Sequence, residues 1–236
     1  MFLSDNEVRI VYSNATAESF PGADAYKILS ESEKLKYDRF HFADDKLRFL
    51  KARYILRTIA SAFHNNCDPK RIEISLNSFG KPFFNDIPLH FSITHSGQVA
   101  AVAFSKHFSV GIDIELKREV SDMSQLAKRF FADPEVNYLK QFRGEELIIN
   151  FFRIWSSKEA YIKAIGLGVS KVLKGFSTVH NNKLSKVVDF EDSSTDYKIM
   201  EVEFGFEYAS AVCIPSILQE PHITLADLND IQLQNL

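Results

Sequence analysis

The sequence has 236 residues, of which 45% are hydrophobic and 25% charged, a composition typical of a globular protein. Its formal net charge of −3 gives no global basic field for nucleic acid, so an anionic ligand needs a local basic cluster. No apolar run is long enough to predict a membrane span, and MFLSDNEVRI lacks the apolar core of a secretory signal. Two distant cysteines, Cys67 and Cys213, indicate reduced thiols in a cytoplasmic protein.

Helical and strand-like patterns alternate along the chain. The expected helices are 30–40, 43–65, 122–131, 133–142 and 145–166. The expected strands are 7–12, 71–76, a hairpin over 90–104, 110–116 and further stretches up to about 214. Asp133 is the expected N-cap of the fourth helix, and Pro134 its first helical residue. The pattern predicts an α+β fold.

A weak internal echo suggests a duplicated unit, because ASAVCI near the end resembles AAVAF near position 100. We therefore expect an N-terminal half over 1–106 and a C-terminal half over 107–215, with 216–236 as a loosely attached tail. Each half is expected to pack a small, mostly antiparallel sheet on a long helix.

The stretch VGIDIE at 110–115 carries two acids on one strand. Successive strand residues alternate between faces, so Asp113 and Glu115 share a face with Gly111, which leaves space for a bulky group. Taken alone, the stretch is better explained by an edge strand with a charged outer face.

A second group lies in the helix WSSKEAYIKAIGLG. Trp155, Glu159 and Lys163 are spaced four apart and fall along one helical face. An ordinary surface pair of Glu and Lys explains them too, although neighbouring apolar residues place the stripe at the border of the packed side.

Asp113, Glu115 and Glu159 together form a hard-oxygen set without His or Cys, which suits Mg²⁺. Because Mg²⁺ commonly shares its coordination shell with substrate phosphates, basic and polar donors are expected near them. The candidates are Arg48, Lys51, Arg53, Arg57, Lys81, Thr94 and His95. Each is also explained by solvation or local structure.

In this order and spacing, GKPFFNDIPLHFSITHSG, VGIDIE, FFADPE and WSSKEAYIKAIGLG resemble the 4′-phosphopantetheinyl transferases of the larger, surfactin-synthetase-activating type. The resemblance covers roughly 30–170. It implies a pseudo-twofold pair of similar α+β halves in a monomeric chain, with coenzyme A at their junction. It also implies Mg²⁺-dependent transfer of phosphopantetheine to a serine of apo acyl or peptidyl carrier proteins, releasing adenosine 3′,5′-bisphosphate.

The resemblance assigns roles to individual residues. Asp113, Glu115 and Glu159 would hold Mg²⁺, and Lys163 would contact the phosphate under attack. His95 and Thr94 would hold phosphate oxygens, and Lys81 would lie near the nucleotide end. The residues expected at the 3′-phosphate are Lys36, Arg48 and Arg53; Glu33 occupies the register of a family lysine, and Lys34, displaced by one, is the alternative.

Glu135 matches the acid of the family's F-F-x-x-x-E stretch and is the candidate general base, directly or through a water. A water held by the metal is the alternative base. The helix start explains the residue equally well, since acids are favoured there.

Two other functions stay open. A nucleotide pyrophosphohydrolase also needs acids and basic residues, and an inactive coenzyme A- or carrier-binding module would keep the fold. The sequence does not distinguish fatty acid, polyketide and nonribosomal peptide carriers as acceptors.

Overall fold

The computed structural model describes residues 3–168, 171–194 and 196–231. The chain forms two compact units. Unit 1 consists of Met1–Leu76, Pro82–His107 and Glu220–Leu236, and unit 2 of Asn77–Lys81 and Phe108–Gln219. Both units combine helices with a mostly antiparallel sheet, which confirms the predicted α+β class of two similar halves.

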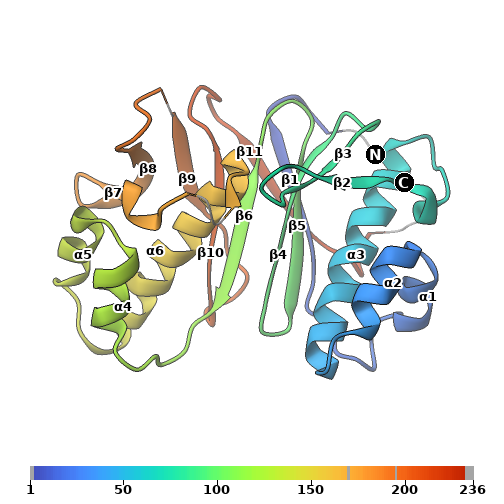
Figure 1. Ribbon diagram of the computed structural model, residues 1–236, viewed down its shortest axis with the longest axis horizontal. Helices are drawn as coiled ribbons and strands as arrows, with labels where there is room; N and C mark the ends of the chain where they lie inside the picture. Colours follow the sequence, from blue (N-terminus) through green and yellow to red (C-terminus); the bar gives the residue numbers. More distant parts are fainter. Residues whose placement is uncertain (1–2, 169–170, 195, 232–236) are drawn as a thin grey trace. The chain divides into compact units, whose positions relative to one another are not determined.

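Unit 1 is built on a four-stranded sheet in the order β11-β1-β5-β4 (Figure 1). Its strands are β1 (Glu7–Ser13), β4 (His90–Ser96), β5 (Val99–Ser105) and β11 (His222–Asp227). Its helices are α1 (Gly22–Lys27), α2 (Glu31–Asp38) and α3 (Ala43–Phe63), with a short η1 (Pro69–Arg71) and a pair of short strands, β2 (Ile74–Leu76) and β3 (Pro82–Phe84).

The core of unit 1 lies between α3 and the sheet. Apolar residues of α3 recur at helical spacing and are buried, among them Leu50, Ile55 and Ile59. They pack toward β5, where every residue of VAAVAFS is buried. The small alanines of this central strand let the helix approach the sheet closely.

The C-terminal segment differs from the expected tail. β11 pairs in parallel with β1, and Thr224 Oγ1 donates to the buried carboxylate of Glu7 at 3.0 Å. The sequence hides this strand because His222–Asp227 lies at an edge, where its residues are only partly buried and its apolar alternation is weak. Residues 232–236 lie outside the described residues.

Unit 2 contains a five-stranded antiparallel sheet in the order β6-β10-β9-β8-β7, with α6 lying on it (Figure 1). Its strands are β6 (Gly111–Leu116), β7 (Phe176–His180), β8 (Lys183–Asp189), β9 (Tyr197–Glu201) and β10 (Tyr208–Pro215). Its helices are α4 (Met123–Phe130), α5 (Asp133–Leu139) and α6 (Gly144–Ile165), with a short η3 (Leu173–Gly175).

Helix boundaries in unit 2 follow local chemistry. α6 ends where Gly166 takes a left-handed conformation with φ of 72°, as the sequence predicts. α5 begins one residue earlier than expected, with Ala132 as the N-cap in place of Asp133. The reason is that the carboxylate of Glu135, in the first turn, accepts a hydrogen bond from the backbone N–H of Ala132 at 2.9 Å. This bond gives the N–H at the helix start a partner.

No helix among the described residues is both long and apolar enough to cross a lipid bilayer.

Candidate active site

Gly111 brings β6 and α6 into direct backbone contact. A Cβ atom at this position would lie 1.9 Å from the carbonyl oxygen of Ala160 and 2.5 Å from the nitrogen of Ala164. The space expected beside the two acids is therefore filled by the helix backbone, not by a ligand. This approach places the acids of β6 against the polar stripe of α6.

Asp113, Glu159 and Lys163 form the polar group at this contact. Lys163 Nζ donates to Asp113 Oδ1 at 2.7 Å and to the carbonyl oxygen of Ile112 at 3.1 Å. Burial raises the pKa of Glu159, the negative charge of Asp113 raises it further, and Lys163 opposes both. The structure thus brings together two of the predicted metal ligands and the predicted phosphate lysine.

The donor set fits a hard divalent cation only in part. Burial and then the negative charge of Asp113 raise the pKa of Glu159, and a bound cation would relieve the repulsion between the two carboxylates. However, among the residues that the structure describes, no three His, Cys, Asp or Glu side chains gather closely enough to hold a metal ion. Glu115 is half-buried on the same strand and does not complete such a group.

Trp155 begins the same stripe but belongs to the core of unit 2. Its ring stacks on Phe151 with centroids 6.2 Å apart and meets Phe130 edge to face at 5.8 Å. Its role is to anchor α6 through aromatic packing.

Glu135 lies away from solvent, with 0% of its side chain exposed. Oε2 accepts from Ala132 N and from Lys158 Nζ, the latter at 2.6 Å. Oε1 accepts from Thr178 N at 2.7 Å and from Thr178 Oγ1 at 2.9 Å. This geometry argues against the predicted general-base role, because a base needs a free lone pair within reach of the proton it takes.

The side chain of Lys81 contacts other residues of unit 2. Its ammonium donates to the carbonyl oxygen of Ala164 at 3.0 Å and to Ser109 Oγ at 3.2 Å. Burial lowers the pKa of Lys81 to about 8. These contacts fasten the loop 77–81 to the end of α6, a role that the prediction of a nucleotide contact did not include.

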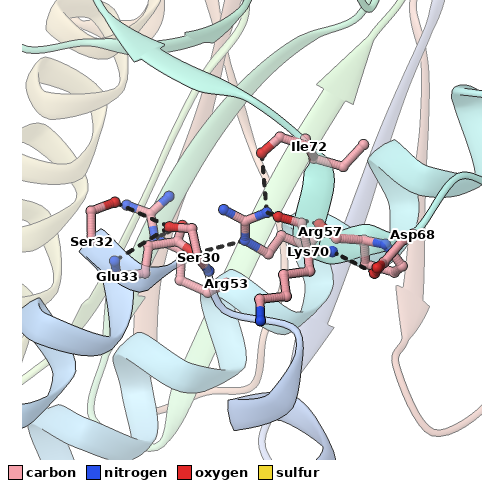
Figure 2. A network of polar contacts seen from close by, with 9 residues as sticks. Ser30, Ser32, Glu33, Arg53, Arg57, Asp68, Lys70 and Ile72 are labelled. Atoms are coloured by element: carbon pink, nitrogen blue, oxygen red, sulfur yellow. Dashed lines mark hydrogen bonds and ion pairs between the residues drawn. The ribbon is translucent and has the colours of Figure 1, made fainter.

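In unit 1, Glu33 is the centre of a buried network (Figure 2). Its carboxylate accepts from Arg57 Nε at 2.6 Å and pairs with Arg53 Nε at 3.4 Å. Arg57 also donates to the carbonyl oxygens of Pro69, Lys70 and Ile72. The acid found in place of a family lysine is therefore the anchor that holds Arg53 and Arg57 of α3.

The predicted 3′-phosphate residues Lys36 and Arg53 converge on one aromatic ring. Lys36 Nζ lies 5.6 Å and Arg53 Cζ 5.3 Å from the centroid of Phe49. Lys34 instead pairs with Glu31 at 3.0 Å and lies over the ring of Tyr26. Of the two candidate lysines, the structure groups Lys36 with Arg53.

Two other basic residues of α3, Arg48 and Lys51, contact the turn of the hairpin formed by β4 and β5. Arg48 Nη1 donates to the carbonyl oxygen of Gly97 at 2.9 Å, and Lys51 Nζ donates to that of Gln98 at 2.7 Å. This turn follows Thr94, which is buried, and His95, which is exposed. Arg48 thereby supports the strand that carries the predicted phosphate donors.

Sequence reasoning missed Lys158, which is buried in unit 2. A signal was present, because Lys158 falls between Ile154 and Ile162 at helical spacing on the apolar side of α6. A lysine in an apolar stripe requires a buried partner, but the sequence does not say that this partner is Glu135.

Comparison with known proteins gives consistent matches along the chain. Residues 109–213 match a family model described as 4′-phosphopantetheinyl transferase superfamily. Residues 16–107 match a model described as 4′-phosphopantetheinyl transferase, N-terminal.

Curated relatives carry the same description. The 4′-phosphopantetheinyl transferase HetI of Nostoc sp. is 36% identical over 148 residues, which are 61% of this chain and 62% of that protein. A putative 4′-phosphopantetheinyl transferase of Synechocystis sp. is 32% identical over 73% of this chain and 70% of its own length. The 4′-phosphopantetheinyl transferase Sfp of Bacillus subtilis is 32% identical over 78% of this chain and 81% of its own length.

Proposed function

Because this chain belongs to the 4′-phosphopantetheinyl transferase family, whose members act on carrier proteins with coenzyme A as substrate, we propose that it modifies a serine of an apo acyl or peptidyl carrier protein. The second product would be adenosine 3′,5′-bisphosphate. The observation that carries the proposal is the contact of β6 with α6, which groups Asp113, Glu159 and Lys163.

In the proposed reaction, the serine oxygen forms a bond to the phosphorus that bears the pantetheine arm. The bond from this phosphorus to the bridging oxygen breaks, and the bridging oxygen leaves with the adenosine 3′,5′-bisphosphate. The serine proton is released to solvent water. Negative charge grows on the leaving oxygen, so the chain must supply positive charge there.

Unit 2 would supply the groups around the reacting phosphate. The proposed ligands for Mg²⁺ are Asp113 and Glu159, and bound Mg²⁺ would neutralise charge on the pyrophosphate. Glu115, which lies on the same strand but does not complete a group of three with them, is the candidate third ligand. Lys163 would donate to a phosphate oxygen, exchanging its present contact with Asp113 for one with the substrate. Glu135 and Lys81 are left out of this set, since their charged groups are already engaged within unit 2.

Unit 1 would supply the groups for the remaining phosphates. Lys36 and Arg53 are proposed to hold the 3′-phosphate, with Arg48 of α3 as a further candidate contact. Thr94 and His95 are proposed to hold pyrophosphate oxygens. Because a single chain contains both units, we further propose that it acts as a monomer. We also propose that it acts in the cytoplasm.

Purified protein, coenzyme A, Mg²⁺ and an apo carrier protein test the proposal. Transfer makes the carrier heavier by one phosphopantetheine group and releases adenosine 3′,5′-bisphosphate in equal amount. A pyrophosphohydrolase would release the same nucleotide but leave the carrier mass unchanged. A binding module would retain coenzyme A and form neither product. Either of these results rejects the transferase proposal, and a panel of apo carriers identifies the preferred acceptor.

A further inference from the structure

Lys158 and Glu135 form a fully enclosed ion pair. Their side chains are 1% and 0% exposed, and Lys158 Nζ lies 2.6 Å from Glu135 Oε2. The ammonium also donates to the carbonyl oxygen of Phe176 at 2.8 Å and lies 4.1 Å from the centre of the Phe176 ring. Thr178 and Ala132 donate to the remaining lone pairs of the carboxylate. The pair therefore ties together α6, the start of α5 and β7.

Stability alone is a weak reason for such a pair. Removing two charges from water is costly, and well-packed apolar residues in place of a buried ion pair are often neutral or stabilising. Burial lowers the pKa of Lys158, and the charge of Glu135 opposes this. Hydrogen bonds are directional and therefore fix the rotation and axial position of a helix. Apolar contacts tolerate small shifts, so an apolar pair would not fix the helix in this way.

The fixed helix is the one that carries the candidate site. Glu159 directly follows Lys158 and is turned about 100° from it around the helix axis. The ion pair holds α6 from the side of α5 and β7, while Gly111 of β6 meets its backbone at Ala160. A rotation of α6 would move Glu159 and Lys163 relative to Asp113, and displacements of about 1 Å can cost roughly 100-fold in rate.

We propose that Glu135, Lys158 and Thr178 are positioning residues, which set the register of α6 so that Glu159 and Lys163 face Asp113. Neither Glu135 nor Lys158 touches the substrate. The inference rests on the proposed transfer for its kinetic readout, but the position of α6 is also measurable without it.

Kinetics of single and double variants separate positioning from catalysis. For Glu135→Gln and Lys158→Met, we expect kcat to fall about 10- to 100-fold with little change in the KM for coenzyme A. The double variant should lose no more than the worse single variant, because both changes break the same contact. Losses that multiply in the double variant would overturn the proposal, since they indicate independent roles.

The pH profile gives a second criterion. A positioning residue lowers the whole profile of kcat, whereas loss of a general base removes the limb that reports its titration. If Glu135→Gln removes that limb while Lys158→Met leaves kcat near the wild-type value, Glu135 is the base and the proposal is wrong. Wild-type kcat in both variants would also reject it.

Glu135→Gln and Lys158→Met can unfold the protein, because each leaves a buried charge without its partner. A smaller change at the same contact and a surface control keep the proposal testable in that case. Thr178→Val removes only the hydroxyl contact with Glu135, and we expect a several-fold fall in kcat with the fold retained. Lys186→Met is the control, because Lys186 pairs with Asp196 at 3.4 Å on the exposed surface of the same unit. Equal effects of Thr178→Val and Lys186→Met would contradict the proposed role.

Amide hydrogen exchange tests the positioning independently of transfer. In Lys158→Met and Thr178→Val, amides of α6 around Glu159 should exchange faster than in the wild type and in Lys186→Met. If the wild-type protein shows no transfer activity and these amides still exchange faster in the two variants, the proposed function is wrong and the positioning role is retained. Unchanged exchange in both variants would reject the positioning itself.

Discussion

Lys36 and Lys34 lie in the same helix of unit 1 but have different surroundings. Lys36 shares the ring of Phe49 with Arg53, whereas Lys34 is paired with Glu31. Two cations beside one ring are a candidate anion site that needs no global basic charge. The proposed 3′-phosphate contact is therefore compatible with a net charge of −3.

These two lysines give a matched test of the 3′-phosphate site. Lys36→Ala should weaken coenzyme A binding roughly 5- to 50-fold, because one charge-assisted contact is lost. Its affinity for 3′-dephospho-coenzyme A should not change. Lys34→Ala serves as the control and should leave both affinities unaltered, as measured by calorimetry. Equal losses for the two ligands in Lys36→Ala would rule out the contact with the 3′-phosphate.

Lys81 predicts a pH dependence of stability. Its pKa falls from 10.5 to about 8 on folding, so the unfolded chain binds this proton more tightly. The free energy of unfolding should therefore rise as the pH increases from about 8 to 10.5, and below pH 8 the destabilising effect is complete. The full effect is on the order of 3 kcal/mol.

The comparison of wild type with Lys81→Met isolates this group. Denaturant unfolding at several pH values should show the wild type gaining stability relative to Lys81→Met between pH 8 and 10.5. A constant difference over that window would show that the ammonium of Lys81 is not desolvated by folding.

At the scale of elements, the contact of β6 with α6 depends on one missing side chain. Gly111→Ala would insert a methyl group 1.9 Å from a backbone carbonyl oxygen, so the helix must move away from the strand. We expect a loss of about 1–3 kcal/mol in the free energy of unfolding and a larger relative loss of transfer activity.

Gly22→Ala is the control for this change. A Cβ at Gly22 would meet nothing closer than 3.9 Å, and the residue lies at the start of α1. Its substitution should change the free energy of unfolding by less than about 0.5 kcal/mol. If Gly111→Ala behaves like Gly22→Ala in denaturant unfolding and in transfer, the close packing at β6 is not what positions the site.

Elements with a clear apolar period or a capping signal could be predicted from the sequence, and two strands without such a signal could not. Apolar periodicity over many residues located α3 and α6, and Ser30 with Glu33 marked the start of α2 by a capping box. β3 and β11 escaped prediction. β3 has three residues, too few for a period, and β11 is a partly buried edge strand.

The candidate site could likewise be predicted only in part from the sequence. The residue types and spacing in VGIDIE and WSSKEAYIK indicated acids and a lysine that act together, and the structure groups Asp113, Glu159 and Lys163. Spacing does not reveal what lies on the other side of a strand or helix. For that reason Gly111 was expected to face a ligand and Glu135 a substrate, whereas the first faces Ala160 and the second Lys158.

In the whole molecule, each of the two units has its own sheet and core, and each is proposed to supply part of the groups that bind the substrate. In unit 1, Glu33 holds Arg53 and Arg57, and in unit 2, Glu135 holds α6. In both, an acid that the sequence left ambiguous supports the elements that carry the proposed functional groups. Charged residues in the interior thus serve the placement of those groups.

The mass of a carrier protein after incubation shows whether the protein transfers phosphopantetheine. With coenzyme A and Mg²⁺, the wild-type protein should add one phosphopantetheine group to the apo carrier. Asp113→Asn should reduce the rate by at least about 100-fold while the protein stays folded, because it removes the charge that Lys163 and Glu159 face. An unmodified carrier with the wild type, or full modification at the wild-type rate with Asp113→Asn, would contradict the account.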